Sequence, residues 1–193
     1  MTNTFRLLAM ALIAMMVGTS TTFSQETNND PKIYPGGETH EVRTYPHEFT
    51  SQQPENIILI IGDGMGVAHV HAGLTANRGR LFLSNFKHVG FTTTHSASSY
   101  ITDSAASATA LATGNKTDNG AIGVDTDQQP VENLTETASA QGYAFGLVAT
   151  SSITHATPGA FVAHQLKRSQ EEEIALDFLD SAIDVFIGGG YDF

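Results

Sequence analysis

The sequence contains no cysteine, which excludes disulfide bonds, zinc sites built from cysteine and thiol nucleophiles. Any bound metal ion must therefore be held by oxygen and imidazole ligands. Basic residues are also scarce, because 9 Lys and Arg stand against 20 Asp and Glu and give a net charge of −11 with neutral histidine. This balance excludes a protein that binds nucleic acid through a basic surface, since such a surface must neutralise phosphates.

No apolar run is long enough to cross a membrane, which takes about 20 residues in a helix. Residues 7–17 form an apolar run that follows Arg6 and precedes a small, polar stretch, as in a secretory signal peptide. The alternative for this run is a buried helix of the mature fold. We expect a signal peptide at residues 1–24, a polar extended leader at residues 25–55 and a folded domain at residues 56–193. The protein is then secreted or periplasmic, without stable membrane insertion after signal cleavage.

The folded part alternates apolar strands with helices. Residues 56–62 are continuously apolar, which predicts a strand covered on both faces in a parallel sheet. Further strands are expected at residues 89–94, 143–150 and 184–187, and helices at residues 104–113, 133–141, 158–164 and 170–182. The apolar face of the last helix is expected to hold Ile174, Leu176, Phe178, Leu179 and Ile183. This order predicts a three-layer α/β/α fold with a mainly parallel central sheet.

Asp63 directly follows the first predicted strand, in the sequence Gly-Asp-Gly-Met-Gly. Ligands of open α/β sheets gather beyond the carboxyl ends of the strands. An ionised carboxylate at this place is costly unless it is paired or bound to a cation. Asp63 is therefore a candidate metal ligand, and the alternative is a helix N-cap at a tight turn.

Ser104 follows Asp103 at the start of a predicted helix that Gly114 ends. If Asp103 caps this helix, free backbone N–H groups converge beside Ser104, where a phosphate could bind. A serine hydroxyl needs an adjacent base or a metal ion to become a nucleophile. The alanine-rich helix offers no base, so the sequence favours metal activation over a His-Asp triad. The alternative is a serine that only packs among small residues.

His155 and Thr157 lie two residues apart in a predicted extended loop, so both side chains could face one cation. The alternative for His155 is a structural role. Arg168 follows an apolar helix, and its planar guanidinium suits two phosphate oxygens. The alternative for Arg168 is a surface charge.

Three segments together resemble the alkaline phosphatase family. They are Asn-Ile-Ile-Leu-Ile-Ile-Gly-Asp-Gly-Met-Gly at residues 56–66, Thr-Asp-Ser-Ala-Ala-Ser-Ala-Thr-Ala-Leu-Ala-Thr-Gly at residues 102–114, and Thr-His-Ala-Thr-Pro-Gly-Ala-Phe-Val-Ala-His at residues 154–164. The resemblance covers residues 55–193. It implies a phosphatase that hydrolyses phosphate monoesters with two zinc ions and one magnesium ion.

The resemblance also implies a role for each candidate residue. Ser104 matches the nucleophile that becomes a phosphoserine, and Arg168 matches the arginine that clamps the phosphoryl oxygens. Asp63 matches the carboxylate that bridges zinc and magnesium, and Thr157 matches a hydroxyl of the magnesium site. His155 stands at a third-site position that is Asp in some members and His in others. Imidazole is the softer ligand, so His155 suits zinc better than magnesium and puts the identity of the third metal in question.

The family completes its zinc sites with Asp, Glu and His from the C-terminal half of a longer chain, so we expect an N-terminal part of an alkaline phosphatase that is inactive alone. The other seven histidines are expected to be structural or surface residues: His40, His47, His69, His71, His88, His95 and His164. Two alternatives stay open, a non-catalytic metal- or phosphate-binding fragment and a related sulfatase or phosphodiesterase. The sequence also leaves a homodimer open.

Overall fold

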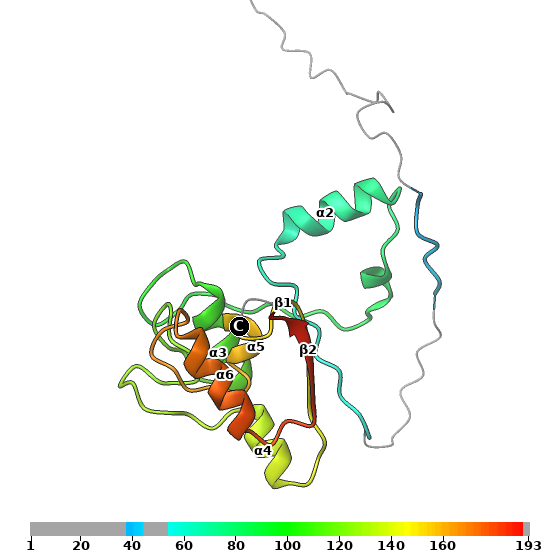
Figure 1. Ribbon diagram of the computed structural model, residues 1–193. Helices are drawn as coiled ribbons and strands as arrows, with labels where there is room; N and C mark the ends of the chain where they lie inside the picture. Colours follow the sequence, from blue (N-terminus) through cyan, green and yellow to red (C-terminus); the bar gives the residue numbers. More distant parts are fainter. Residues whose placement is uncertain (1–37, 45–53, 191–193) are drawn as a thin grey trace, which may run out of the picture. The chain divides into compact units, whose positions relative to one another are not determined.

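The computed structural model describes residues 38–44 and 54–190 (Figure 1). The predicted signal peptide lies outside these residues, as does most of the predicted leader. The elements in chain order are α2 (Val67–Ala76), the 3₁₀-helix η1 (Phe82–Asn85), α3 (Ser104–Thr113), α4 (Leu134–Ala140), β1 (Gly146–Ser152), α5 (Ala156–Gly159), α6 (Glu171–Asp180) and β2 (Val185–Gly189). None of the helices in the described ranges is long and apolar enough to cross a membrane.

The chain divides into two compact units. In the first unit, the described leader residues 38–44 lie against residues 77–85. The Asn77 side chain accepts a hydrogen bond from the His40 N–H at 2.7 Å and donates one to the His40 carbonyl at 3.1 Å. Arg80 donates to the carbonyl of the buried Val42 at 2.6 Å. These contacts to backbone groups fix residues 38–44 of the leader, which form no helix or strand.

The second unit contains a parallel sheet formed by β1 and β2, which lie side by side in Figure 1. Gly146 pairs with Val185 and Val148 with Ile187, and the register shifts before Ser152 pairs with Gly189. Helices α5 and α6 form the crossover between the two strands, because parallel neighbours need a long connection. This arrangement confirms the predicted α/β class.

Two predicted strands are absent from the described part of the chain. Residues 56–62 and 89–94 run without strand hydrogen bonding. Ile57 and Ile60 are 87% and 82% exposed, so the prediction of a strand buried on both faces is wrong here. A strand depends on hydrogen-bonded neighbours and covering helices, which the apolar run cannot supply by itself. Residues 57–61 instead line a cleft of about 670 Å³, which residues 144–151 of the same unit also line.

The core of the second unit lies among α3, α5, α6 and the segment after α5. Its buried members are Ala105, Ala108, Ile122, Ala156, Ala160, Val162, Ala163, Ile174 and Phe178, with Leu147, Ile153 and Ile183 packed against them. On α6 only Ile174 and Phe178 are buried, and the predicted core residues Leu176 and Leu179 are exposed. Residues four apart share one face of a helix, whereas Leu176 lies about 200° around the helix from Ile174.

Helix α4 lies close to its predicted range, whereas α5 does not. Helix α4 begins after the N-cap Asn133, where the Glu136 side chain completes a capping box. Helix α5 begins at Ala156 and ends at Gly159, so the predicted helix at 158–164 is shorter and starts earlier than expected. This early start places Thr157 in the first turn of α5, two residues after the N-cap His155, so the prediction of an extended loop that holds both residues is wrong.

Candidate active site

Helix α3 places Ser104 at its N-terminus, as the sequence predicted. The Asp103 Oδ1 atom accepts a hydrogen bond from the Ala106 N–H at 2.9 Å, and Gly114 ends the helix with a φ of 75°. The helix is built largely of alanine, and its buried face lets α5 approach closely. Ser104 therefore lies on an element that is capped at both ends and fixed in the core.

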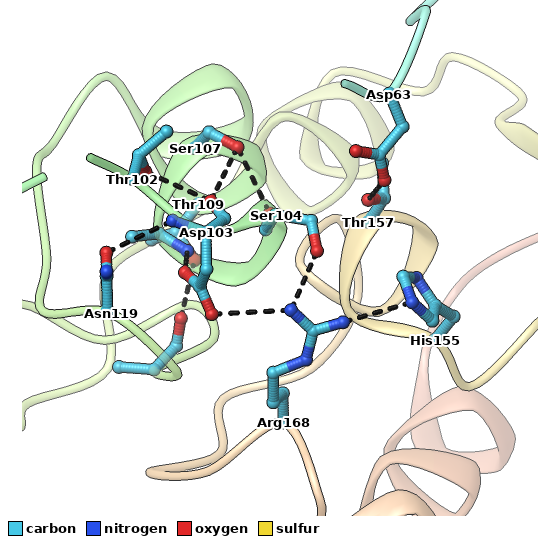
Figure 2. Close-up of polar contacts among 12 residues, drawn as sticks. Asp63, Thr102, Asp103, Ser104, Ser107, Thr109, Asn119, His155, Thr157 and Arg168 are labelled. Atoms are coloured by element: carbon cyan, nitrogen blue, oxygen red, sulfur yellow. Dashed lines mark hydrogen bonds and ion pairs between the residues drawn. The ribbon is translucent and has the colours of Figure 1, made fainter. Parts of the chain in front are cut away.

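Arg168 contacts Ser104 directly, although the two residues are far apart in the sequence. Its Nη1 donates to the Ser104 Oγ at 2.8 Å and to the Asp103 Oδ2 at 3.3 Å (Figure 2). The side chains of Arg168 and Asp103 are 34% and 26% exposed. The structure thus brings together the predicted nucleophile and the predicted phosphate-binding arginine, and Asp103 orients the guanidinium.

His155 lies on the other side of the Arg168 guanidinium, with its Nε2 atom 3.0 Å from Arg168 Nη2. Arginine can only donate, so the His155 Nε2 atom accepts this hydrogen bond and the proton of the neutral ring lies on Nδ1. This assignment leaves a buried Nδ1 atom that has no hydrogen-bond partner among the described residues. An unpaired buried donor is costly, which marks His155 as a residue whose surroundings are incomplete.

No histidine or carboxylate within residues 38–44 and 54–190 accepts a hydrogen bond from the Ser104 hydroxyl. Arg168 lies between Ser104 and His155 in Figure 2, and His155 contacts Arg168 and not this serine. This geometry lacks the nucleophile–base–orienter chain of a serine triad.

Asp63 and Thr157 form the second pair of the site. The Thr157 Oγ1 atom donates to Asp63 Oδ2 at 2.7 Å. Asp63 lies in the turn before α2, and its carboxylate contacts Thr157 instead of capping the helix. The structure therefore joins two of the predicted metal-site residues, and His155 lies at the N-cap of α5, two residues before Thr157.

These side chains fit part of a metal site. Asp63 and Thr157 offer hard oxygen donors that suit Mg²⁺, and His155 offers an imidazole whose Nδ1 is unpaired. Among the described residues, no group of three or more His, Asp or Glu side chains could hold a metal ion. A full coordination shell would therefore need further ligands, such as water or substrate oxygens.

His164 lies outside this site and contacts three separate segments of the chain. Its Nδ1 atom is 2.6 Å from the Gly123 carbonyl, its Nε2 atom is 3.0 Å from Glu136 Oε1, and its backbone N–H donates to Asp177 Oδ2 at 3.2 Å. Burial lowers the pKa of His164, but the hydrogen bonds to Gly123 and Glu136 and the charges of Glu136 and Asp177 outweigh burial. The net effect is a raised pKa of His164, because both ring nitrogens contact acceptor oxygens.

Sequence reasoning missed the contacts by which three residues support the site. Asp103 was predicted as a helix cap, and its second oxygen also pairs with Arg168. Asn119 accepts a hydrogen bond from the Asp103 N–H at 3.2 Å and donates to the Ile101 carbonyl at 3.0 Å. Thr109 contacts a loop that packs on α3. Their partners are distant in sequence, so no local pattern pointed to them.

Comparison with known proteins gives one consistent family. The family described as Alkaline phosphatase matches residues 54–192. Alkaline phosphatase 4 of Bacillus subtilis (strain 168) is 43% identical over 150 residues, which cover 70% of this chain and 32% of that protein. The chain thus spans about a third of the length of this curated relative.

Solved structures agree with this match. The alkaline phosphatase from the Antarctic bacterium TAB5 is 45% identical, has a TM-score of 0.70, and is matched over 72% of this chain and 41% of that chain. A TAB5 variant with histidine replaced by aspartate, with Mg bound in its M3 site, has a TM-score of 0.65 at 44% identity, over 66% of this chain and 37% of that chain. The family match covers well over half of the sequence and agrees with the fold and with the three polar segments, so this chain belongs to the alkaline phosphatase family.

Proposed function

We propose that this protein hydrolyses phosphate monoesters, with Ser104 as the nucleophile and a phosphoserine as the intermediate. The observation that carries the proposal is the contact between Ser104 Oγ and Arg168 Nη1 at 2.8 Å, at the N-terminus of α3. The guanidinium and the free N–H groups at the start of the helix supply the donors that a phosphoryl group needs.

The chemistry takes place in two displacements at phosphorus. The Ser104 oxygen attacks phosphorus and its proton passes to solvent. The bond between phosphorus and the alcohol oxygen breaks, the electron pair stays on that oxygen, and it takes up a proton from solvent to leave as the alcohol. Water then attacks the phosphoserine, which restores the Ser104 hydroxyl and releases phosphate. Arg168 stabilises the charge on the non-bridging oxygens in both steps, and Asp103 keeps its guanidinium oriented.

We assign Asp63, Thr157 and His155 to the third metal site, the magnesium position, with Asp63 shared with one of the two zinc ions of the complete centre. When bound, such ions act as Lewis acids toward the attacking and leaving oxygens. This assignment is supported by a relative, the TAB5 variant in which a histidine is replaced by aspartate and Mg is bound in the M3 site. A histidine at residue 155 favours zinc over magnesium there, because imidazole is the softer ligand.

The test compares hydrolysis of p-nitrophenyl phosphate at alkaline pH by the wild type, Ser104→Ala and chelated wild type. We expect both the substitution and the chelator to remove most of the activity. The matched control is Ser107→Ala. Ser107 lies on the same helix, and within residues 38–44 and 54–190 its hydroxyl bonds only to the carbonyls of Asp103 and Ser104. Full activity in Ser104→Ala would reject the assigned nucleophile.

A second candidate function is non-catalytic binding of metal or phosphate, and it applies to the 193 residues alone. It is favoured by the absence, within the described ranges, of a group of three metal-ligating side chains. Robust zinc-dependent turnover by the 193-residue polypeptide would contradict this candidate. Binding of inorganic phosphate without turnover would support it.

We also propose that the protein is exported, with a signal peptide at residues 1–24, a leader at residues 25–55 and the domain from residue 56. N-terminal sequencing of protein recovered from the periplasm or medium tests the signal peptide. Retention of Arg6 in the mature protein would contradict it. A homodimer stays a prediction that sedimentation can test.

A further inference from the structure

Thr109 joins the helix that carries Ser104 to a distant loop. The residue is fully buried on α3. Its hydroxyl donates to the Ala121 carbonyl at 3.3 Å and accepts a hydrogen bond from the Gly123 N–H at 3.0 Å. A hydroxyl can donate and accept at once, so this one side chain satisfies two backbone groups of the loop. We name residues 119–124 the brace loop.

The brace loop also holds the segment that ends in Arg168. The Arg168 N–H donates to the Gly120 carbonyl at 2.7 Å. Ile122 and Gln165 exchange two backbone hydrogen bonds, both of 2.9 Å, in an antiparallel bridge. The position of the Arg168 backbone is therefore set by this loop, and the guanidinium reaches Ser104 from there.

A third contact joins the brace loop to the turn before Ser104. Asn119 bonds to the backbone on both sides of Thr102, through the Ile101 carbonyl and the Asp103 N–H. Figure 2 shows Asn119 beside Asp103, with Arg168 reaching Asp103 and Ser104 from another segment. One loop is thus bonded to the Ser104 helix, to the Asp103 turn and to the Arg168 segment.

The brace loop packs closely against its neighbours. Gly123 has a φ of 61°, and a Cβ atom at this position would collide with the Ala163 carbonyl oxygen. Ala121, Ile122 and Val124 are all buried. Without the Thr109 hydroxyl, the Gly123 N–H would be a buried donor without an acceptor, and the loop would have to move to reach one.

We propose that Thr109 is a positioning residue that fixes the distance between Ser104 and Arg168 through the brace loop. The proposal rests on the proposed function, because it assumes that this distance matters for phosphoryl transfer. Small misplacements of reacting groups have large effects on rate, on the order of a hundredfold for about 1 Å. Thr109 touches no substrate in this scheme and acts through Arg168.

The experiment uses the metal-loaded, full-length protein and p-nitrophenyl phosphate. Thr109→Val removes the hydroxyl at nearly constant shape, and we expect kcat/KM to fall by about 10- to 100-fold. Thr109→Ser restores the hydroxyl and should recover the rate to within about threefold of the wild type, by the same positioning argument. The matched control is Thr113→Val, because the Thr113 hydroxyl lies on the same helix and, in the part of the chain that the structure describes, bonds only to the Thr109 carbonyl and the Asn115 N–H.

A double-mutant cycle separates positioning from general destabilisation. In an Arg168→Ala background, Thr109→Val should cost less than about threefold, because the group that it positions is absent. An equal loss in both backgrounds, or no loss in the wild type, would overturn the proposal. If Thr109→Val does not fold, Asn119→Ala loosens the same loop from its exposed end and should show the same dependence on Arg168.

Crystal structures distinguish this proposal from the proposed function. A wild type without phosphatase activity would refute the function, and the structure of Thr109→Val would still decide the positioning role. Loss of the 2.8 Å contact between Arg168 Nη1 and Ser104 Oγ in the variant supports the proposal. An unchanged contact overturns it.

Discussion

The Asp103 carboxylate uses its two oxygens for different tasks. Oδ1 caps α3 through the Ala106 N–H, and Oδ2 pairs with Arg168, which in turn reaches Ser104. The pair is partly exposed, so its direct contribution to stability is small and its main effect is to orient the guanidinium. At the scale of single residues, the site depends on side chains such as Asp103, which orients Arg168, and Arg168 contacts the Ser104 hydroxyl.

The substitution Asp103→Asn separates these two tasks. Asparagine caps helices as well as aspartate does, so the melting temperature should stay nearly unchanged. The charge that orients Arg168 is lost, and the affinity for inorganic phosphate should fall by about two- to fivefold, as expected for a partly exposed pair. Phosphate inhibition constants measure this, with Asp103→Ala as the variant that loses the cap as well. Unchanged phosphate affinity in Asp103→Asn would contradict the orienting role.

The raised pKa of His164 predicts that the stability of the fold depends on pH. Because its pKa is raised on folding, the stabilisation is fully present below pH 6.5 and is lost as the pH rises through the pKa of the folded state. The urea midpoint of the wild type should exceed that of His164→Gln most at pH 5.5 to 6, and the difference should shrink by pH 9. Glu136→Gln keeps a hydrogen-bond acceptor without the charge and should weaken this pH dependence. A difference that does not vary with pH would count against the assignment.

At the scale of elements, small residues allow close packing around the nucleophile helix. The buried alanines of α3 face α5, and Gly123 brings the brace loop against the segment after α5. The loop and the helix therefore form one packed layer behind Ser104. The brace loop carries no catalytic group of its own, but it bonds to the helix that begins at Ser104 and to the Arg168 backbone.

The substitution Gly123→Ala should destabilise the fold strongly. The new Cβ atom would meet the Ala163 carbonyl oxygen, and the φ of 61° disfavours any side chain. We expect a loss of about 2–4 kcal/mol in urea unfolding, typical of overpacking combined with backbone strain. Gly114→Ala is the control, because it has a similar φ of 75° but open space around its Cβ and should lose only about 1 kcal/mol. Equal losses in the two variants would show that the collision is relieved.

At the scale of the whole molecule, much apolar surface is exposed. Ile57, Ile58 and Ile60 of the first apolar run are exposed, as are Phe91 and Val148. These side chains belong to segments that the sequence predicts as strands of a sheet. Exposed apolar patches of this kind promote association.

The 193-residue polypeptide should therefore bind a hydrophobic dye and self-associate. We expect enhanced fluorescence of anilinonaphthalene sulfonate and concentration-dependent elution in gel filtration. Replacing Ile58 and Ile60 by Thr should reduce both effects, because polar side chains lower the exposed apolar area. A monomer that does not bind the dye would show that these residues are covered in solution.

The sequence predicted what depends on local chemistry and missed what depends on neighbours. Asp103 and Gly114 bounded α3 correctly because capping involves residues within one turn. Residues 56–62 were predicted as a buried strand, but burial depends on partners that the run itself does not contain. The contacts of Thr109 and Asn119 were not predicted, because each side chain bonds to a backbone group more than a helical turn away in the sequence.

The most direct test of the account is to trap the covalent intermediate. The metal-loaded protein is mixed with a ³²P-labelled phosphate monoester, quenched in acid and digested, and the labelled peptide is sequenced. The account predicts that the label is on Ser104 and that Ser104→Ala incorporates none. Label on another side chain, or hydrolysis without any labelled peptide in the wild type and at an undiminished rate in Ser104→Ala, would contradict it.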